Sequence, residues 1–141
     1  MNSADQGVYS VGAGILPIIY AAGAGADLLY AATRGACARR NGKRLAVSAT
    51  TNLTRASLDV GYSSRTPAAA FGLARVADGR LDGYAERHLY AWDALAGLLL
   101  VEEAGGRANA FLLGDALTAG NETIAATPAL YTVLVDTLAG R

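Results

Sequence analysis

Two acidic residues, Glu86 and Asp93, lie seven positions apart where a predicted strand gives way to a predicted helix. The strand is expected over residues 81–87, which places Glu86 near its end. Asp93 falls in the first turn of the helix, where unpaired backbone amides and the helix dipole favour a carboxylate. Ligands of α/β proteins commonly bind where strands end and helices begin. The spacing therefore predicts that both carboxylates converge on one binding site.

The helix that would carry Asp93 has clear internal and terminal signals. From Trp92 onward, apolar side chains recur at near-helical spacing and form a wide stripe, which includes Leu95, Leu98, Leu99 and Val101. The pair Gly105-Gly106 supplies the left-handed residue with which helices commonly end. We therefore expect a helix from Trp92 to Glu103 with its apolar stripe against the core.

The remaining chain divides into two sections with different patterns. Up to about residue 62, strand and hairpin signals dominate; the expected strands cover residues 8–16, 17–20, 35–40, 43–47 and 56–62, with 27–32 either extended or briefly helical. Asn41-Gly42 is the strongest hairpin signal, because both positions tolerate positive φ. From residue 68, helix and strand alternate: helix over 68–77, strands over 107–113 and 123–126, a loop over 114–120, and a last helix from Pro128 to Leu138.

These patterns predict an α/β layered sandwich that forms one compact unit. Residues 1–67 would supply an antiparallel sheet, and residues 68–141 would supply an α/β lobe that carries both acids. A chain of 141 residues can bury a core of this kind.

Composition narrows the classes of partner. Twelve basic and twelve acidic residues cancel, which argues against electrostatic attraction to nucleic acid or to an anionic membrane. Hydrophobic residues make up 52% of the chain and the mean hydropathy is +0.26, so we expect either a large core or an apolar surface covered by another chain. No signal peptide is visible, and the longest apolar run is far below the roughly 20 residues that cross a bilayer. We expect a soluble, cytoplasmic protein.

Several residue types that could do chemistry have simpler explanations. Cys37 is the only cysteine and is expected to be a packed thiol. His88 is the only histidine, so no zinc site is expected, and its side chain should be exposed or hydrogen-bonded. Tyr84 and Tyr90 are expected to pack, and Trp92 is expected to anchor the core.

The central stretch resembles the C-terminal signature of the inositol monophosphatase family. That signature is WD, then AG, several apolar positions and EAGG; the matching residues here are Trp92-Asp93, Ala96-Gly97 and 103–106. Outside this stretch, residues 34–48 resemble the family's glycine-rich hairpin, in which an NG turn leads into a strand ending at VS. Residues 123–128 resemble its late strand. The resemblance covers nearly the whole chain.

The resemblance implies a magnesium-dependent phosphomonoesterase that acts on inositol phosphates or similar sugar phosphates. Asp93 would be a metal ligand and would also contact a substrate hydroxyl. Glu86 would bind an inositol hydroxyl, and Ala69 would contact substrate through its backbone. Magnesium prefers hard oxygen ligands, which a carboxylate at a helix start can supply, and such ions can activate water and stabilise a leaving phosphate oxygen.

The sequence departs from the family pattern in its N-terminal half. The family's GEE and DPxDGT segments, which hold most of its metal ligands, are absent. Family members are also roughly twice as long, and the chain looks abridged near Leu16-Pro17 and Pro67-Ala68. Asp93 with Glu86 nearby cannot alone hold a catalytic magnesium cluster, since Mg²⁺ needs several oxygen ligands in near-octahedral geometry.

Three interpretations remain open at this point. The chain could keep the substrate half of a phosphatase site and be weak or inactive alone. It could be active with ligands borrowed from a partner chain. It could also be a non-catalytic binding or scaffold domain on the same core, because a family name does not transfer function. Missing helices would leave one face of a sheet uncovered, so we also expect a homodimer or a partner-completed assembly.

Overall fold

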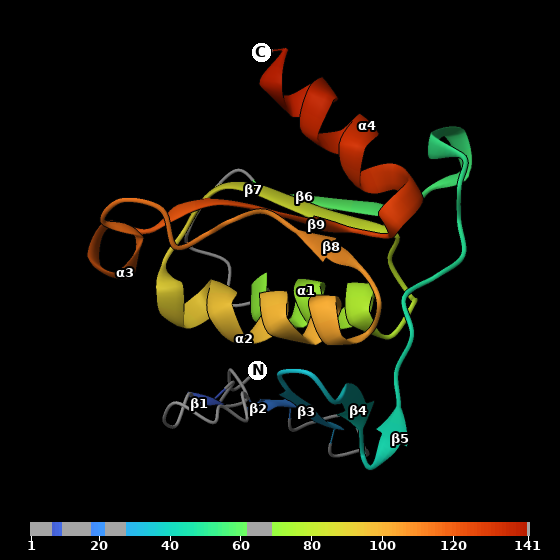
Figure 1. The fold of residues 1–141 in the computed structure, drawn as a ribbon, viewed down its shortest axis with the longest axis vertical. Helices are drawn as coiled ribbons and strands as arrows, with labels where there is room; N and C mark the ends of the chain where they lie inside the picture. The colour runs from blue at the N-terminus through green and yellow to red at the C-terminus, as the bar shows by residue number, and fades with distance from the viewer. Residues whose placement is uncertain (1–6, 10–17, 22–27, 62–68, 141) are drawn as a thin grey trace, which may run out of the picture.

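The chain folds into alternating layers of sheet and helix. The structure is a computed structural model, and it describes residues 7–9, 18–21, 28–61 and 69–140. Figure 1 shows one sheet on one side, two helices in the middle, a second sheet beyond them and the C-terminal helix outermost. The predicted α/β layered sandwich is therefore confirmed.

The first sheet is an antiparallel meander built from the N-terminal section. Its strands pair in the order β1-β2-β3-β4-β5, with bounds β1 Gly7–Tyr9, β2 Ile18–Ala21, β3 Leu28–Thr33, β4 Cys37–Arg40 and β5 Lys43–Arg44. The last two strands form the predicted hairpin, although the strand expected over 43–47 ends at Arg44. Asn41 and Gly42 have φ of 48° and 82°, the left-handed conformation that a tight hairpin turn requires.

The second sheet carries the candidate site. Among the described residues its strand order is β6-β7-β9-β8, with bounds β6 Leu58–Gly61, β7 Gly83–Leu89, β8 Arg107–Ala108 and β9 Asn121–Ala126. Strand β7 lies between β6, which is parallel to it, and β9, which is antiparallel. Its side chains are mostly buried on both faces because helices cover both sides of the sheet.

Helices α1 (Ala69–Ala77) and α2 (Ala91–Glu103) fill the space between the sheets. Helix α2 contacts strands of both sheets, which explains why its apolar residues extend almost all round the helix. Helix α4 (Pro128–Ala139) packs on the outer face of the second sheet, and it begins at proline as predicted. The short helices η1 (Leu53–Arg55) and α3 (Ala116–Ala119) lie in connections. None of the helices in the described ranges is long and apolar enough to cross a bilayer.

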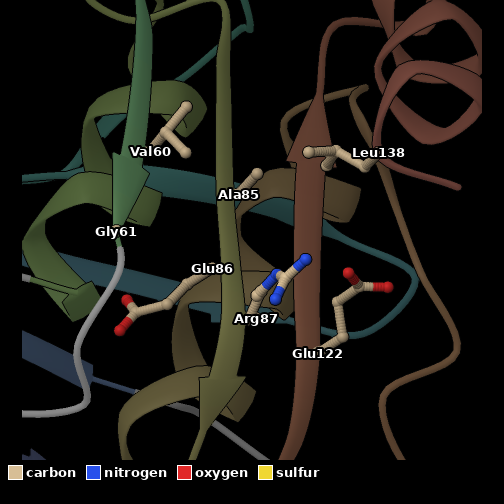
Figure 2. A pocket seen from close by; sticks show the side chains of 7 residues that line it. All are labelled: Val60, Gly61, Ala85, Glu86, Arg87, Glu122 and Leu138. Atoms are coloured by element: carbon tan, nitrogen blue, oxygen red, sulfur yellow. The ribbon is translucent and has the colours of Figure 1, made fainter. Parts of the chain in front are cut away.

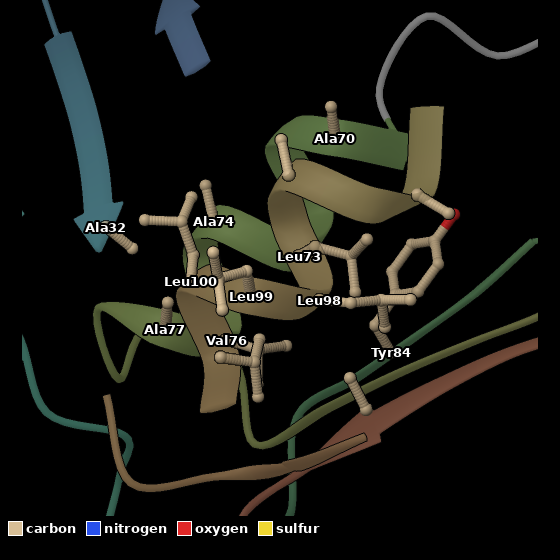
Figure 3. Packing of buried hydrophobic residues seen from close by; sticks show 14 of the residues in the cluster. Ala32, Ala70, Leu73, Ala74, Val76, Ala77, Tyr84, Leu98, Leu99 and Leu100 are labelled. Atoms are coloured by element: carbon tan, nitrogen blue, oxygen red, sulfur yellow. The ribbon is translucent and has the colours of Figure 1, made fainter. Parts of the chain in front are cut away.

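The largest cluster of buried apolar residues is centred on the contact between α1 and α2. Leu73 of α1 and Leu100 of α2 are fully buried there, and Figure 3 shows Leu73 beside the ring of Tyr84. Gly97 lets the helices approach closely, since a Cβ at that position would lie 2.5 Å from Leu73 Cβ. A second cluster joins α4 to the outer face of the second sheet.

The expectations for three further segments are wrong. The strand expected over 81–87 runs from Gly83 to Leu89, so Glu86 lies at its centre and not near its end. The strand expected over 107–113 stops at Ala108, because the Asn109 side chain replaces ladder bonds by donating to Glu122 O and accepting from Ile124 N. The loop expected over 114–120 contains one helical turn, α3, which ends at Gly120 with φ 79°.

Trp92 is not a core anchor. It is 58% exposed and stacks on Tyr90, with ring centroids 4.5 Å apart and planes at 9°. The buried positions of this helical turn are taken by Ala91 and Ala94. The helix itself begins one residue before the prediction, at Ala91.

The expectations for His88 and Cys37 agree with the structure, whereas those for the two junctions lie outside the described residues. His88 is hydrogen-bonded as expected, with Nε2 2.6 Å from Ala119 O, and Cys37 is a half-buried free thiol. The two junctions that look abridged, Leu16-Pro17 and Pro67-Ala68, lie outside the described residues. The second of them is also the predicted boundary between the two sections of the chain.

Candidate functional site

The candidate site is built on the face of β7 that looks toward α1. Tyr84 and Glu86 share this face because side chains alternate along a strand. The Tyr84 hydroxyl donates a short hydrogen bond to Glu86 Oε2. Both residues are buried, with exposed fractions of 3% and 4%. A carboxylate is thus held inside the domain by a neighbouring phenol.

The second oxygen of Glu86 has no hydrogen-bond partner among the described residues. Glu86 Oε1 and Thr123 Oγ1 are buried and make no hydrogen bond within the described part of the chain. Thr123 lies directly opposite Glu86 on β9, and directly opposed side chains have Cβ atoms about 4.5–5.5 Å apart. Buried polar atoms nearly always have a hydrogen-bond partner, so this pair is a candidate for contact with a ligand.

Two glycines make room for the Tyr84–Glu86 pair. A Cβ at Gly72 of α1 would lie 2.8 Å from two ring atoms of Tyr84, and a Cβ at Gly61 of β6 would lie 2.6 Å from Glu86 Oε2. Both distances are shorter than real Cβ contacts allow. The phenol and the carboxylate therefore pack directly against the backbone of the neighbouring elements.

Two further acids, Asp59 and Asp93, affect Tyr84 through their charges. Asp59 of β6 pairs in register with Tyr84, and its Oδ2 lies 3.1 Å from the Cβ position of Gly72. Burial, the hydrogen bond to Glu86 and the charges of Glu86, Asp59 and Asp93 all raise the pKa of Tyr84 above its usual range. The phenol therefore stays protonated and remains a donor.

Asp93 occupies the first turn of α2, as predicted, and is half-buried. Burial raises the pKa of its carboxyl above the ordinary aspartate value. Its charge acts on the same phenol as that of Glu86, so the structure brings the two predicted acids into one electrostatic neighbourhood.

Ala69 is the first residue of α1 and is buried. Residues three apart lie on the same side of a helix, so Ala69 shares the side of α1 that carries Gly72. Ala69 therefore lies about one helical turn from Gly72, which packs against the Tyr84 ring, and its backbone contact with substrate stays a prediction.

A pocket of about 270 Å³ lies beside β7. It is lined by Val60, Gly61, Ala85, Glu86, Arg87, Glu122 and Leu138. Figure 2 shows that Glu86 and Arg87 leave β7 on opposite sides: the Glu86 carboxylate reaches toward β6, and the Arg87 guanidinium extends toward β9. Glu86 is therefore the member of this pocket that belongs to the acidic site.

The described residues do not fit a catalytic magnesium cluster. Asp59, Glu86 and Asp93 offer the oxygen ligands that Mg²⁺ prefers. Within the part of the chain that the structure describes, however, no group of three His, Cys, Asp or Glu side chains could hold a metal ion. The arrangement offers acceptors for hydroxyl donors and lacks a complete set of metal ligands.

Sequence reasoning missed Asp59, Thr123 and the role of Tyr84. The i, i+2 spacing of Tyr84 and Glu86 on a predicted strand was a signal for their shared face. Asp59 and Thr123 had no local signal, because they join the site through strand pairing with β7.

Comparison with known proteins gives one consistent family. A sequence model of the inositol monophosphatase family matches residues 62–139. An inositol-1-monophosphatase from Rhizobium meliloti is 38% identical over 57% of this chain and 39% of its own length. The Nus factor SuhB of Escherichia coli is 35% identical over 71% of this chain and 46% of its own length. The chain thus spans less than half the length of these two curated relatives.

The fold agrees with this result. The solved structure of an inositol monophosphatase from Anabaena superposes with a TM-score of 0.73 at 29% identity. The superposition covers 89% of this chain and 58% of that protein. Nearly all of this chain therefore corresponds to a part of that larger fold.

Proposed function

Because this chain belongs to the inositol monophosphatase family, we propose that it carries the hydroxyl-binding part of a phosphomonoesterase site. Its substrate would be an inositol phosphate or a similar sugar phosphate. Glu86 and Asp93 would accept hydrogen bonds from ring hydroxyls, and the backbone at Ala69 would contact the substrate.

The observation that carries this proposal is Glu86 Oε1, which is buried and makes no hydrogen bond to the part of the chain that the structure describes. When it is ionised, a carboxylate can accept hydrogen bonds but cannot donate them. Glu86 Oε1 therefore needs a hydrogen-bond donor. A buried polar atom without a partner costs roughly 1–3 kcal/mol, which a ligand donor would recover. Polyols present many hydroxyl donors that could supply it.

Charge explains which part of the substrate this half of the site binds. Asp59, Glu86 and Asp93 give the site a negative field, and like charges repel. A phosphate group would be rejected here without cations, whereas neutral hydroxyls would be accepted. The described residues hold no group of three His, Cys, Asp or Glu side chains that could bind a metal ion, so we propose that the chain alone is weak or inactive.

A phosphate-release assay tests this function. With magnesium chloride and myo-inositol 1-phosphate, the chain alone should release phosphate slowly or not at all. Calorimetric titration of the chain with Mg²⁺ should show no tight binding. Any residual release should be lost in Asp93→Asn and kept in Asp115→Asn, a control at the exposed start of α3. Rapid turnover by the isolated chain, or release that survives Asp93→Asn, would contradict the proposal.

A partner-completed assembly is the alternative that a specific surface supports. Large apolar side chains are exposed around α3 and the start of α2, namely Trp92, Leu112, Leu113 and Leu117. Contiguous exposed apolar surface is typical of interaction sites. We propose that copies of the chain, or a partner that supplies the missing ligands, cover this surface. Sedimentation equilibrium should then give a mass above that of the monomer. The mass should fall toward that of the monomer in the double variant Leu113→Asp, Leu117→Asp. A clean monomer at high concentration argues against it.

A further inference from the structure

We propose that Tyr84 is a positioning residue for the polyol site: its hydroxyl occupies Glu86 Oε2 and leaves Oε1 for a ligand hydroxyl. This inference rests on the proposed function and adds a specificity element to it. It assigns a role to a residue for which the sequence indicated packing only.

The hydrogen bond gives the two oxygens of Glu86 different roles. Oε2 accepts from the Tyr84 hydroxyl, whereas Oε1 has no partner among the described residues. Because a freely rotating carboxylate could present either oxygen in many directions, holding one of them fixes the direction of the other. Fixing a group before binding raises affinity by removing the cost of ordering it in the complex.

The donor is both permanent and immobile. The raised pKa of Tyr84, caused first by burial and then by the bond to Glu86, keeps the hydroxyl protonated over the working pH range. Gly72 lies against one edge of the ring and Gly61 against the Glu86 carboxylate, at distances that leave no room for a Cβ. The pair therefore has little freedom to move apart.

The surroundings leave Glu86 as the acceptor of this hydroxyl. The charges of Asp59 and Asp93 raise the pKa of Tyr84, but the hydrogen bond of the Tyr84 hydroxyl goes to Glu86. Tyr84 acts on a ligand only through Glu86, because its hydroxyl is already used. A general packing role of Tyr84 would not depend on Glu86, so this dependence distinguishes the two roles.

A double-mutant cycle on ligand affinity tests the dependence. The substitutions are Tyr84→Phe, Glu86→Gln and the pair, and the probe is uncharged myo-inositol followed by NMR titration. Tyr84→Phe keeps the ring on Gly72 and removes the hydroxyl, so affinity should fall about fivefold, the cost of ordering the freed Glu86 side chain when the ligand binds. In the Glu86→Gln background the same change should cost about twofold or less, because coupled residues are not additive.

The controls separate this inference from the proposed function. Tyr90→Phe removes a hydroxyl from a tyrosine that contacts His88 and Trp92 through its ring, and it should leave affinity unchanged. An equal loss from Tyr84→Phe in both backgrounds, or no loss in either, would overturn the positioning role while binding itself stands. If the unsubstituted chain does not bind myo-inositol, the proposed function fails first and the inference falls with it.

Discussion

Replacing Gly97 by alanine should destabilise the protein by about 3 kcal/mol. In an open helix interior the same change would stabilise by about 1 kcal/mol, because alanine is the better helix former. Here the new Cβ would lie 2.5 Å from Leu73 Cβ and 2.6 Å from its Cδ1. A Cβ moves only with its backbone, so α1 and α2 must separate. The cost of this clash outweighs the gain in helix propensity, so the substitution lowers the stability of the protein instead of raising it.

Urea unfolding followed by circular dichroism measures this effect. The matched control is Gly140→Ala at the end of α4, where a Cβ would meet nothing closer than 3.5 Å and φ is an ordinary −74°. The control should unfold within about 0.5 kcal/mol of the unsubstituted chain. An unchanged urea midpoint for Gly97→Ala would show that the contact between α1 and α2 is looser than described. Because α1 also carries Gly72, ligand affinity should fall together with stability.

Elements set by local chemistry could be predicted from the sequence. The Asn41-Gly42 hairpin forms because its two turn residues adopt positive φ, which is a property of those residues alone. Helix α4 begins at Pro128, whose fixed φ suits a first helical turn. Helix α2 ends at Glu103 before Gly105, which has φ 89°. Each of these signals lies within a few residues of the feature that it predicts.

Features that depend on tertiary packing could not be predicted in the same way. An apolar helix between two sheets has no single buried face, so the periodicity of its side chains does not indicate that Trp92 is exposed to solvent. Strand β8 ends early because Asn109 bonds across to β9, a contact between segments more than ten residues apart. Neither outcome follows from periodicity.

The site was predictable in part for the same reason. Asp93 and Glu86 are close in sequence, and the strand-to-helix connection between them is local. Asp59 enters through the parallel pairing of β6 with β7, and Thr123 enters through the antiparallel pairing of β9. Strand order in a sheet is a global property. The functional roles of Asp93, Glu86 and Ala69 stay predictions.

Removing either acid should weaken binding of the same polyol. Glu86→Gln replaces the charged acceptor at Oε1 by a neutral amide, and Asp93→Asn does the same at the start of α2. Hydrogen bonds to charged groups contribute about 1.5–3 kcal/mol, so each substitution should lower affinity by at least about tenfold. Asp136→Asn on α4 is the control, since Asp136 is exposed and lies outside the site.

NMR titration of the chain with myo-inositol, which carries no phosphate, tests the central claim most directly. The account predicts that the unsubstituted chain and Asp136→Asn bind it equally, and that Glu86→Gln and Asp93→Asn both bind it at least about tenfold more weakly. If one acid can be neutralised with no change in affinity while the other cannot, the two acids do not share a ligand, and the account of a single hydroxyl-binding site is contradicted.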